Sequence, residues 1–388
     1  MGCQTLTRSN LGFLGIVVSD YTKLTSINVA RGLAAFSVFV YHYQVGAVLA
    51  KYTGIGAFNW IGFPGANYGV TLFFVISGFC IHGSEWRRLQ RDPEAAFSLR
   101  SYAERRVRRI YPVYLFALLI SCLLNGINGD WPSFTDLHVH IFLLHGFSQA
   151  YFNSINLVLW TISIEAFFYI IYPLWLKYRL QAGLLRAFVG GTLLSMACCA
   201  LTAAYFYPYS LPSRWFFLNT WGGWLLGALL AETMETSPQF YRSWKWWGIG
   251  IIVGAFGLFA EVSDFYQGHW LILKFPVRIY LCAWPLAGLV LAEKNLCSSR
   301  GIIGKAVAFL SWIGLASYSV YLLHEPLITL RNLVQNQVPF VYFKMPFQIA
   351  SFFVILGISW LSYRYLELRF MRPRNQMQVA PDVSPAPQ

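Results

Sequence analysis

The chain has 388 residues, of which 57% are hydrophobic and only 12% are charged. Its mean hydropathy of +0.50 excludes an ordinary water-soluble domain and is typical of a protein that crosses the bilayer several times. The net charge of +13 would suggest a nucleic-acid partner for a soluble protein, but the positions of the basic residues favour another explanation.

Apolar stretches long enough to cross a membrane recur along the whole chain. We expect about ten, at 28–49, 66–86, 110–127, 156–177, 184–206, 215–233, 246–262, 270–292, 307–330 and 346–366. With both termini in the cytoplasm, most Lys and Arg residues fall on the cytoplasmic side, and the exceptions are Lys51, Arg214, Lys274, Arg278, Arg331 and Lys344. The sequence therefore predicts an all-α, polytopic integral membrane helical bundle. Its basic residues face the cytoplasm and the membrane lipids, with no nucleic acid as a partner.

The first predicted span carries two ionisable residues, Arg31 and His42, in apolar surroundings. Eleven positions separate them, so both side chains lie on one helix face, about 16 Å apart. Ionisable residues inside a span are rare and point to function. The ordinary alternatives are a hydrogen-bonded packing histidine and an arginine that reaches the lipid headgroups, and the spacing alone does not decide between them.

The second predicted span has the order Gly-Val, Leu-Phe-Phe-Val and Ser-Gly-Phe between Gly69 and Phe79. Ser77 and Gly78 would let a ligand or another helix approach the backbone closely. Helix packing alone would also explain these small residues.

A strongly basic segment ends in Arg105, Arg106 and Arg109, immediately before the third predicted span. Such residues commonly anchor a span at the cytoplasmic surface. Their close spacing also forms a cationic cluster suited to the phosphates of a cytosolic cofactor. Both interpretations stay open on the residues alone.

The outer connection 128–155 contains His138, His140 and His145. On a helix the first two would point to different faces, and no carboxylate stands at a convincing ligand spacing. We therefore predict no metal site, and expect residues 137–148 to form a half-inserted or interfacial helix.

The fourth predicted span contains Glu165, although an acidic residue at the centre of a span costs about 2.5–3.5 kcal/mol on insertion scales. Such a carboxylate needs a partner or water. Glu165 lies about 13 Å below the outer surface and His42 about 10 Å below it, so we expect the two side chains to be able to meet.

The ninth predicted span carries Ser317, Tyr318, His324 and Glu325, with His324 about 10 Å from the outer end. This depth matches that of His42 and Glu165. The last span ends in a segment with Tyr363 and Glu367, and the Pro- and Gln-rich tail after it is expected to be disordered.

Five of these motifs, in this order, resemble those of the membrane acyltransferase-3 family. They are Arg31 with His42, the Gly69–Phe79 segment, the arginine cluster, Trp160-Thr with Glu165, and Ser317-Tyr with His324. The resemblance covers residues 26 to 369. It divides the chain into a cytoplasmic lead-in (1–25), a membrane acyltransferase domain (26–369) and a disordered cytoplasmic tail (370–388).

This resemblance implies an enzyme of a bacterial cytoplasmic (inner) membrane that moves an acyl group, commonly acetyl, from cytoplasmic acyl-CoA to a hydroxyl of an extracytoplasmic or lipid-linked glycan. Acetyl-CoA would be a substrate, with no permanently bound cofactor. Some relatives carry an additional extracytoplasmic domain, which we do not expect in this chain. Any partner for the final transfer would then be a separate extracytoplasmic transferase.

The resemblance and the chemistry together suggest a role for each site residue. A histidine suits the removal of a hydroxyl proton near neutral pH, so His42 is predicted as general base and Glu165 as its orienting partner. The remaining predictions place CoA phosphates on Arg31, Arg105, Arg106 and Arg109, and the substrate pocket at Ser77, Tyr318, His324 and Glu325.

A membrane carrier or flippase for a lipid-linked sugar or a small molecule is the alternative, because it too would need ionisable residues in a cavity. Carriers often contain repeated halves. The stretch 190–388 shows no second Arg-to-His segment and no second Ser-Gly-Phe, which favours the enzyme.

Overall fold

The computed structural model describes residues 24–62, 65–94, 96–206, 210–262, 274–337 and 341–371. The expected lead-in and tail lie almost entirely outside these residues. Within them the chain is helical and contains no strand. The predicted all-α class is therefore confirmed for the described part of the protein.

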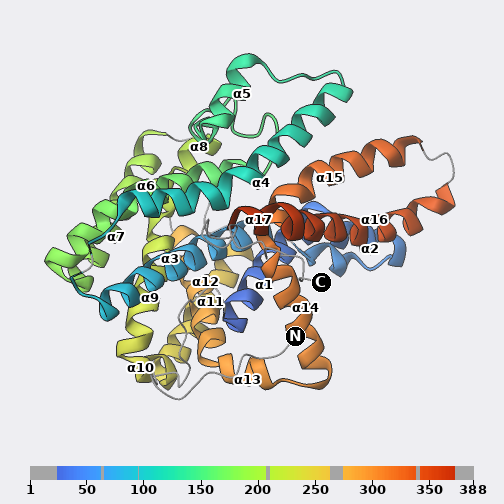
Figure 1. Cartoon of the computed structure of the whole chain (residues 1–388). Helices are drawn as coiled ribbons and strands as arrows, with labels where there is room; N and C mark the ends of the chain where they lie inside the picture. The colour runs from blue at the N-terminus through green and yellow to red at the C-terminus, as the bar shows by residue number, and fades with distance from the viewer. Residues whose placement is uncertain are drawn as a thin grey trace, which may run out of the picture.

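The helices follow one another along the described chain (Figure 1). The long ones are α1 (Thr25–His42), α3 (Gly65–Arg91), α4 (Leu99–Ile127), α6 (Trp160–Ala182), α7 (Leu184–Tyr205), α9 (Phe217–Thr236), α11 (Trp244–Val262), α12 (Lys274–Leu291), α14 (Gly301–Leu315), α15 (Ser317–Gln337) and α16 (Val341–Ser362). The short ones are α2 (Val45–Thr53), α5 (Phe134–Ile141), α8 (Leu211–Arg214), α10 (Pro238–Arg242), α13 (Glu293–Ser298) and α17 (Leu368–Met371). Two 3-10 turns, η2 (Gly56–Trp60) and η3 (His145–Phe147), and a π-helical turn, η5 (Tyr363–Glu367), complete the described chain.

Among the described residues, three helices are long and apolar enough to cross a membrane: α4, α7, and the helical run from Met345 to Met371. The number rises to five if each of two bent helix pairs is counted as one span. The protein is thus a helical membrane protein. The count of ten spans and the cytoplasmic position of both termini stay predictions.

Two predicted continuous spans are broken, which corrects the sequence-based prediction. The stretch 28–49 divides into α1 and α2, which meet at 54°, because Gln44 between them adopts a left-handed backbone conformation with φ of 57°. The stretch 307–330 divides into α14 and α15, which meet at 76° on either side of Ala316. Both breaks lie beside residues predicted to be functional.

Helix α1 lies in the interior of the bundle and packs against α3, α12, α14 and α15 (Figure 1). Its first turn is capped from a distant part of the chain. The carboxylate of Glu293 accepts hydrogen bonds from the backbone N–H groups of Thr25 (2.8 Å) and Ser26 (2.7 Å). A carboxylate at a helix N-terminus satisfies unpaired donors and favours the helix dipole, so α13 fixes the start of α1.

Helices α3 and α9 cross at a pair of glycines. A methyl group on Gly78 would overlap the carbonyl oxygen of Trp224, and one on Gly227 would overlap that of Val75. Each helix therefore brings its backbone against a glycine of the other, as small residues permit within lipid. The Gly78 of the Ser-Gly-Phe motif is explained by this packing.

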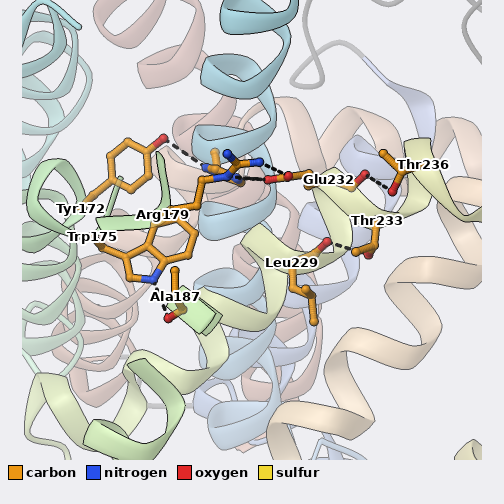
Figure 2. Close-up of polar contacts among 9 residues, drawn as sticks. Tyr172, Trp175, Arg179, Ala187, Leu229, Glu232, Thr233 and Thr236 are labelled. Atoms are coloured by element: carbon orange, nitrogen blue, oxygen red, sulfur yellow. Dashed lines mark hydrogen bonds and ion pairs between the residues drawn. The ribbon is translucent and has the colours of Figure 1, made fainter. Parts of the chain in front are cut away.

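A buried polar cluster joins α3, α6 and α9 (Figure 2). This cluster was not predicted from the sequence. Glu232 accepts a hydrogen bond from Arg179 and lies 3.0 Å from Nε2 of His82, whose Nδ1 is 3.3 Å from the Tyr172 hydroxyl. The Arg179 guanidinium also covers the ring of Trp86. Since His82 and Glu232 are almost completely buried, each requires the other as a partner.

Candidate active site

A pocket opens between α1, α3, α4, α6 and α15 and encloses about 860 Å³ of space, part of it continuous with solvent. Its lining combines charged, hydroxyl and aromatic groups, with Arg31, Ser77, Arg106, Arg109, Glu165 and Tyr318 among the lining residues. Residues predicted from five separate motifs therefore meet in one cavity.

Three lining residues of the pocket, Arg31, Arg106 and Arg109, are cationic. The basic segment and the third apolar stretch form a single helix, α4, which carries Arg106 and Arg109 along the pocket wall. Arg31 donates to the sulfur of Cys80 at 3.4 Å. The concentration of three guanidinium groups from two helices gives the pocket a site for an anion.

Arg106 and Arg109 are held in different ways. The guanidinium of Arg106 lies over the rings of Tyr102 (5.4 Å) and Tyr169 (5.5 Å). Arg109 is attracted by the carboxylates of Glu367 and Glu165. These contacts orient the cations without neutralising the pocket, so capacity for a ligand's negative charge remains.

The structure does not bring Arg105 into the pocket. Its side chain is exposed and donates to the Ser101 hydroxyl at 2.7 Å. Arg105 points about 100° away from Arg106 around α4, which explains why neighbours in sequence have different surroundings.

Glu165 stands at the centre of a group of hydroxyls. The same carboxylate oxygen accepts hydrogen bonds from Ser77 (3.0 Å) and from Tyr169. Tyr318, on the facing wall, donates instead to the carbonyl of Ile110 at 2.9 Å. Among the described residues, the hydrogen-bond partners of Glu165 are thus pocket hydroxyls, and the expected contact with His42 is not formed.

His42 instead pairs with His324. Nδ1 of His42 lies 3.2 Å from Nε2 of His324 and 3.0 Å from the carbonyl oxygen of Val38. Nδ1 of His324 lies 3.2 Å from the carbonyl oxygen of Val320. His324 is completely buried, whereas His42, at the last position of α1, is partly exposed.

A layer of side chains separates the histidine pair from the pocket. Tyr321 lines the pocket on one side, and its ring lies 5.9 Å from that of His324 on the other. The Thr161 hydroxyl is hydrogen-bonded to that of Tyr321 at 3.0 Å, and the ring of Phe73 packs edge-on against Tyr321. Along α15, His324 lies about 10 Å beyond Ser317 at the pocket wall.

Two further residues complete the description of the site. Glu325 does not line the pocket, and its carboxylate bonds to the Thr329 side chain one turn further along α15. Glu367 was noted in the sequence only as part of the segment that ends the last predicted span. It is buried and accepts hydrogen bonds from the hydroxyl (2.8 Å) and the backbone N–H of Ser319, which caps the first turn of α15. Its position as an acidic residue at the end of an apolar helix is the signal that could have marked it.

The histidines of the connection between α4 and α6 form a different arrangement. The rings of His140 and His145 stack with centroids 4.0 Å apart, and Nδ1 of His140 lies 3.0 Å from the Asp136 carboxylate. In the part of the chain that the structure describes, no group of three His, Cys, Asp or Glu side chains is placed to hold a metal ion. The nitrogen lone pairs of stacked rings lie in parallel planes, so they do not converge on one ion.

Comparison with known proteins adds independent information. Peptidoglycan O-acetyltransferase OatA of Listeria monocytogenes is 28% identical over 377 residues, which cover 88% of this chain and 55% of the relative. O-acetyltransferase OatA of Staphylococcus aureus is 26% identical over 381 residues, which cover 89% of this chain and 56% of the relative. The chain thus spans about half the length of these curated relatives. No solved structure matches it.

The family model of an acyltransferase domain matches residues 24–364, which include the pocket, the histidine pair and every residue predicted for the site. The resemblance seen in the five motifs is therefore confirmed, and the chain belongs to the acyltransferase-3 family.

Proposed function

We propose that this protein transfers an acyl group, in the simplest case acetyl, from cytoplasmic acyl-CoA to a hydroxyl of an extracytoplasmic or lipid-linked glycan. The observation that carries the proposal is one pocket whose lining holds three arginines together with Ser77, Glu165 and Tyr321, and Tyr321 also contacts the ring of His324 beside His42. A donor with phosphates at one end and a reactive acyl group at the other matches this distribution of charge.

In this proposal Arg31, Arg106 and Arg109 hold the CoA phosphates, because guanidinium groups bind phosphate oxygens through paired, charge-assisted hydrogen bonds. The acyl-carrying arm then extends past Ser77 and Glu165. Its amide groups can hydrogen-bond to these side chains, so we assign Glu165 to binding of the arm and not to orientation of His42. Arg105 and Glu325, which stand outside the pocket, receive no contact with the donor.

The acyl group reaches His42 when the side chains of Tyr321 and Phe73 move aside. His42 removes the proton of the acceptor hydroxyl, whose oxygen attacks the thioester carbon. The carbon–sulfur bond breaks as the new ester bond forms. The proton held by His42 passes to the departing thiolate, so the products are an O-acylated glycan and free CoA.

The cation formed on His42 lies in the last turn of α1. The carboxyl end of a helix favours positive charge by about 0.3–1 kcal/mol, and more where the site is partly buried. The position of His42 at the break between α1 and α2 therefore supports its role as a base.

Because the relative from Listeria monocytogenes is a peptidoglycan O-acetyltransferase, peptidoglycan is the first acceptor to test, ahead of exopolysaccharide and lipopolysaccharide. We place the protein in the cytoplasmic membrane of a bacterium, where cytosolic donor and outer acceptor meet across one bilayer. A separate extracytoplasmic transferase as partner stays a prediction.

Glycan O-acylation in cells tests the proposal. Cells without the gene are complemented with wild type, His42→Ala or His138→Ala at equal membrane levels, and the cell-surface glycans are analysed by mass spectrometry. His138 lies on α5, away from the pocket, and serves as the matched control. Ester-linked acyl groups should disappear in the deletion and with His42→Ala, and return with wild type and His138→Ala. Full rescue by His42→Ala would contradict the proposal and favour a carrier.

A further inference from the structure

The hydrogen bonds of the histidine pair determine where its protons lie. A carbonyl oxygen only accepts hydrogen bonds, so the contact between Nδ1 of His324 and the Val320 carbonyl places a hydrogen on that nitrogen. In a neutral imidazole the other nitrogen is then an acceptor. Nε2 of His324, which faces His42, therefore presents a lone pair.

The same reasoning applies to His42. Its Nδ1 faces two acceptors, the Val38 carbonyl at 3.0 Å and Nε2 of His324 at 3.2 Å. Nδ1 must carry the hydrogen, which it shares between them. The free lone pair of neutral His42 is consequently on Nε2, the nitrogen directed away from this contact.

Packing fixes the orientation of the His324 ring, whose Nε2 presents its lone pair to His42. His324 has no exposed surface, and its ring lies against Phe39 (6.1 Å between ring centroids) and Tyr321 (5.9 Å). Phe39 is three residues before His42 on α1, so the helix that carries His42 also packs against His324. A ring packed on several sides cannot turn to expose its other nitrogen without displacing these neighbours.

We infer that His324 is a positioning residue that orients His42 and fixes its tautomer, so that Nε2 of His42 is the basic nitrogen of the acyl transfer. This inference rests on the proposed function and deepens it. His324 takes the part that sequence reasoning gave to Glu165, and it does so as a neutral acceptor in place of a carboxylate.

The pair has room for only one additional proton. When Nε2 of His42 takes the proton of the acceptor hydroxyl, the Nδ1–H bonds to His324 and Val38 become charge-assisted and therefore stronger. A second cation on His324 would lie 3.2 Å from the first, and Nδ1 of His324 already donates to a backbone carbonyl, which cannot take up a proton. The proton therefore stays on His42 until the thiolate leaves.

Three substitutions of His324 test the inference in the full-length protein, reconstituted in lipid with labelled acetyl-CoA and a glycan acceptor. In His324→Gln the side-chain oxygen can occupy the position of Nε2 and accept from His42. In His324→Asn the amide ends near the position of Nδ1 and falls short, and His324→Leu removes the acceptor. We expect kcat to fall less than about 10-fold in the Gln variant and about 100-fold in the Asn and Leu variants, with KM for acetyl-CoA unchanged.

The decisive result is the order of the kcat values of the three His324 variants. Equal activity of the Leu variant and wild type would overturn the inference, as would equal losses in Gln and Leu at equal thermal stability. In the His42→Ala background the Leu substitution should cause no further loss, because a residue that acts through His42 has nothing left to orient. An additional 100-fold loss there would also contradict the inference.

A second measurement does not depend on activity. In protein labelled with ¹⁵N at its seven histidines, the His42 signals are identified by their loss in His42→Ala, and their shifts report which nitrogen carries hydrogen. We expect the neutral Nδ1–H form, and a neutral Nε2–H form would overturn the tautomer assignment. An inactive wild type with the Nδ1–H form would instead mean that the proposed function fails and the geometry stands.

Discussion

At the scale of single residues, the arginines of α4 differ in position although they are close in sequence. Arg106 and Arg109 line the pocket, whereas Arg105 is exposed and bonded to Ser101. The helix thus divides one cationic cluster into a part that can meet a ligand and a part that faces the surface. This division allows phosphate binding to be tested separately from anchoring.

Removing a charge inside the pocket should weaken donor binding. Because a hydrogen bond to a charged group contributes about 1.5–3 kcal/mol, Arg109→Gln should raise KM for acetyl-CoA roughly 10- to 100-fold and change kcat less. Arg105→Gln has the same change of net charge and should leave KM within about twofold. Steady-state kinetics of both variants provide the check, and equal increases in KM would show that the cluster acts only through the general potential of the surface.

The connection between α4 and α6 contains a titratable group that the mechanism does not use. Burial, together with the neighbouring His140, lowers the pKa of His145 to about 3. In the unfolded chain this pKa returns to about 6.5, so below that pH the unfolded state binds protons more readily than the folded state. Stability contributed by neutral His145 is therefore complete above pH 6.5 and is lost as the pH falls.

This effect predicts a loss of about 2 kcal/mol between pH 7.5 and pH 5 from His145 alone. In His145→Phe the ring stack can be kept without titration, so the fall in the thermal unfolding midpoint between these pH values should become smaller. His138→Phe should keep the full fall. If His145→Phe loses as much stability on acidification as wild type, protonation of His145 is not the cause.

At the scale of elements, two helix breaks and two capping carboxylates shape the site. The break after α1 places His42 at a helix end, and the break before α15 turns Ser317 and Tyr318 into the pocket wall. Glu293 caps α1, and Glu367 caps α15. The α3–α9 crossing then sets the wall that carries Ser77, one residue before Gly78.

Replacing either glycine of the α3–α9 crossing with a larger residue should loosen the packing of the wall that carries Ser77. In Gly78→Ala or Gly227→Ala the new methyl group overlaps a backbone carbonyl, so the helices must separate at a cost of about 2–3 kcal/mol or more. We expect a lower unfolding midpoint in detergent and reduced activity. Gly248→Ala on α11 is the control, because its methyl group meets no atom within 4 Å and should instead stabilise its helix by about 0.5–1 kcal/mol. An unchanged midpoint for both crossing variants would contradict the close approach.

At the scale of the whole molecule, the sequence was sufficient for the helical class, the family and six of the residues that line the pocket, but it also placed Arg105 and Glu325 at the site, and these lie outside the pocket. The helical class follows from hydropathy, the family from the resemblance of five motifs, and the pocket residues from that resemblance together with ionisable groups in apolar helices, whose cost makes them visible. The partners of those residues were not predictable in the same way. We expected Glu165 and His42 to meet because their depths in the membrane agreed. Depth alone does not reveal the helix breaks and rotations that direct His42 toward His324. The pair formed by His82 and Glu232 was also missed, because the two residues lie on helices that are far apart in sequence.

The central claim is that His42 serves transfer of an acyl group from CoA to a glycan hydroxyl. The most direct test is the purified protein in lipid vesicles with acetyl-CoA labelled in its acetyl group and peptidoglycan fragments, for wild type, His42→Ala and His138→Ala. We predict ester-linked label on the glycan and stoichiometric release of free CoA with wild type and His138→Ala, and a loss of at least about 100-fold with His42→Ala. Labelled glycan formed equally well by His42→Ala, or glycan moved across the vesicle membrane without any label by wild type, would contradict this account.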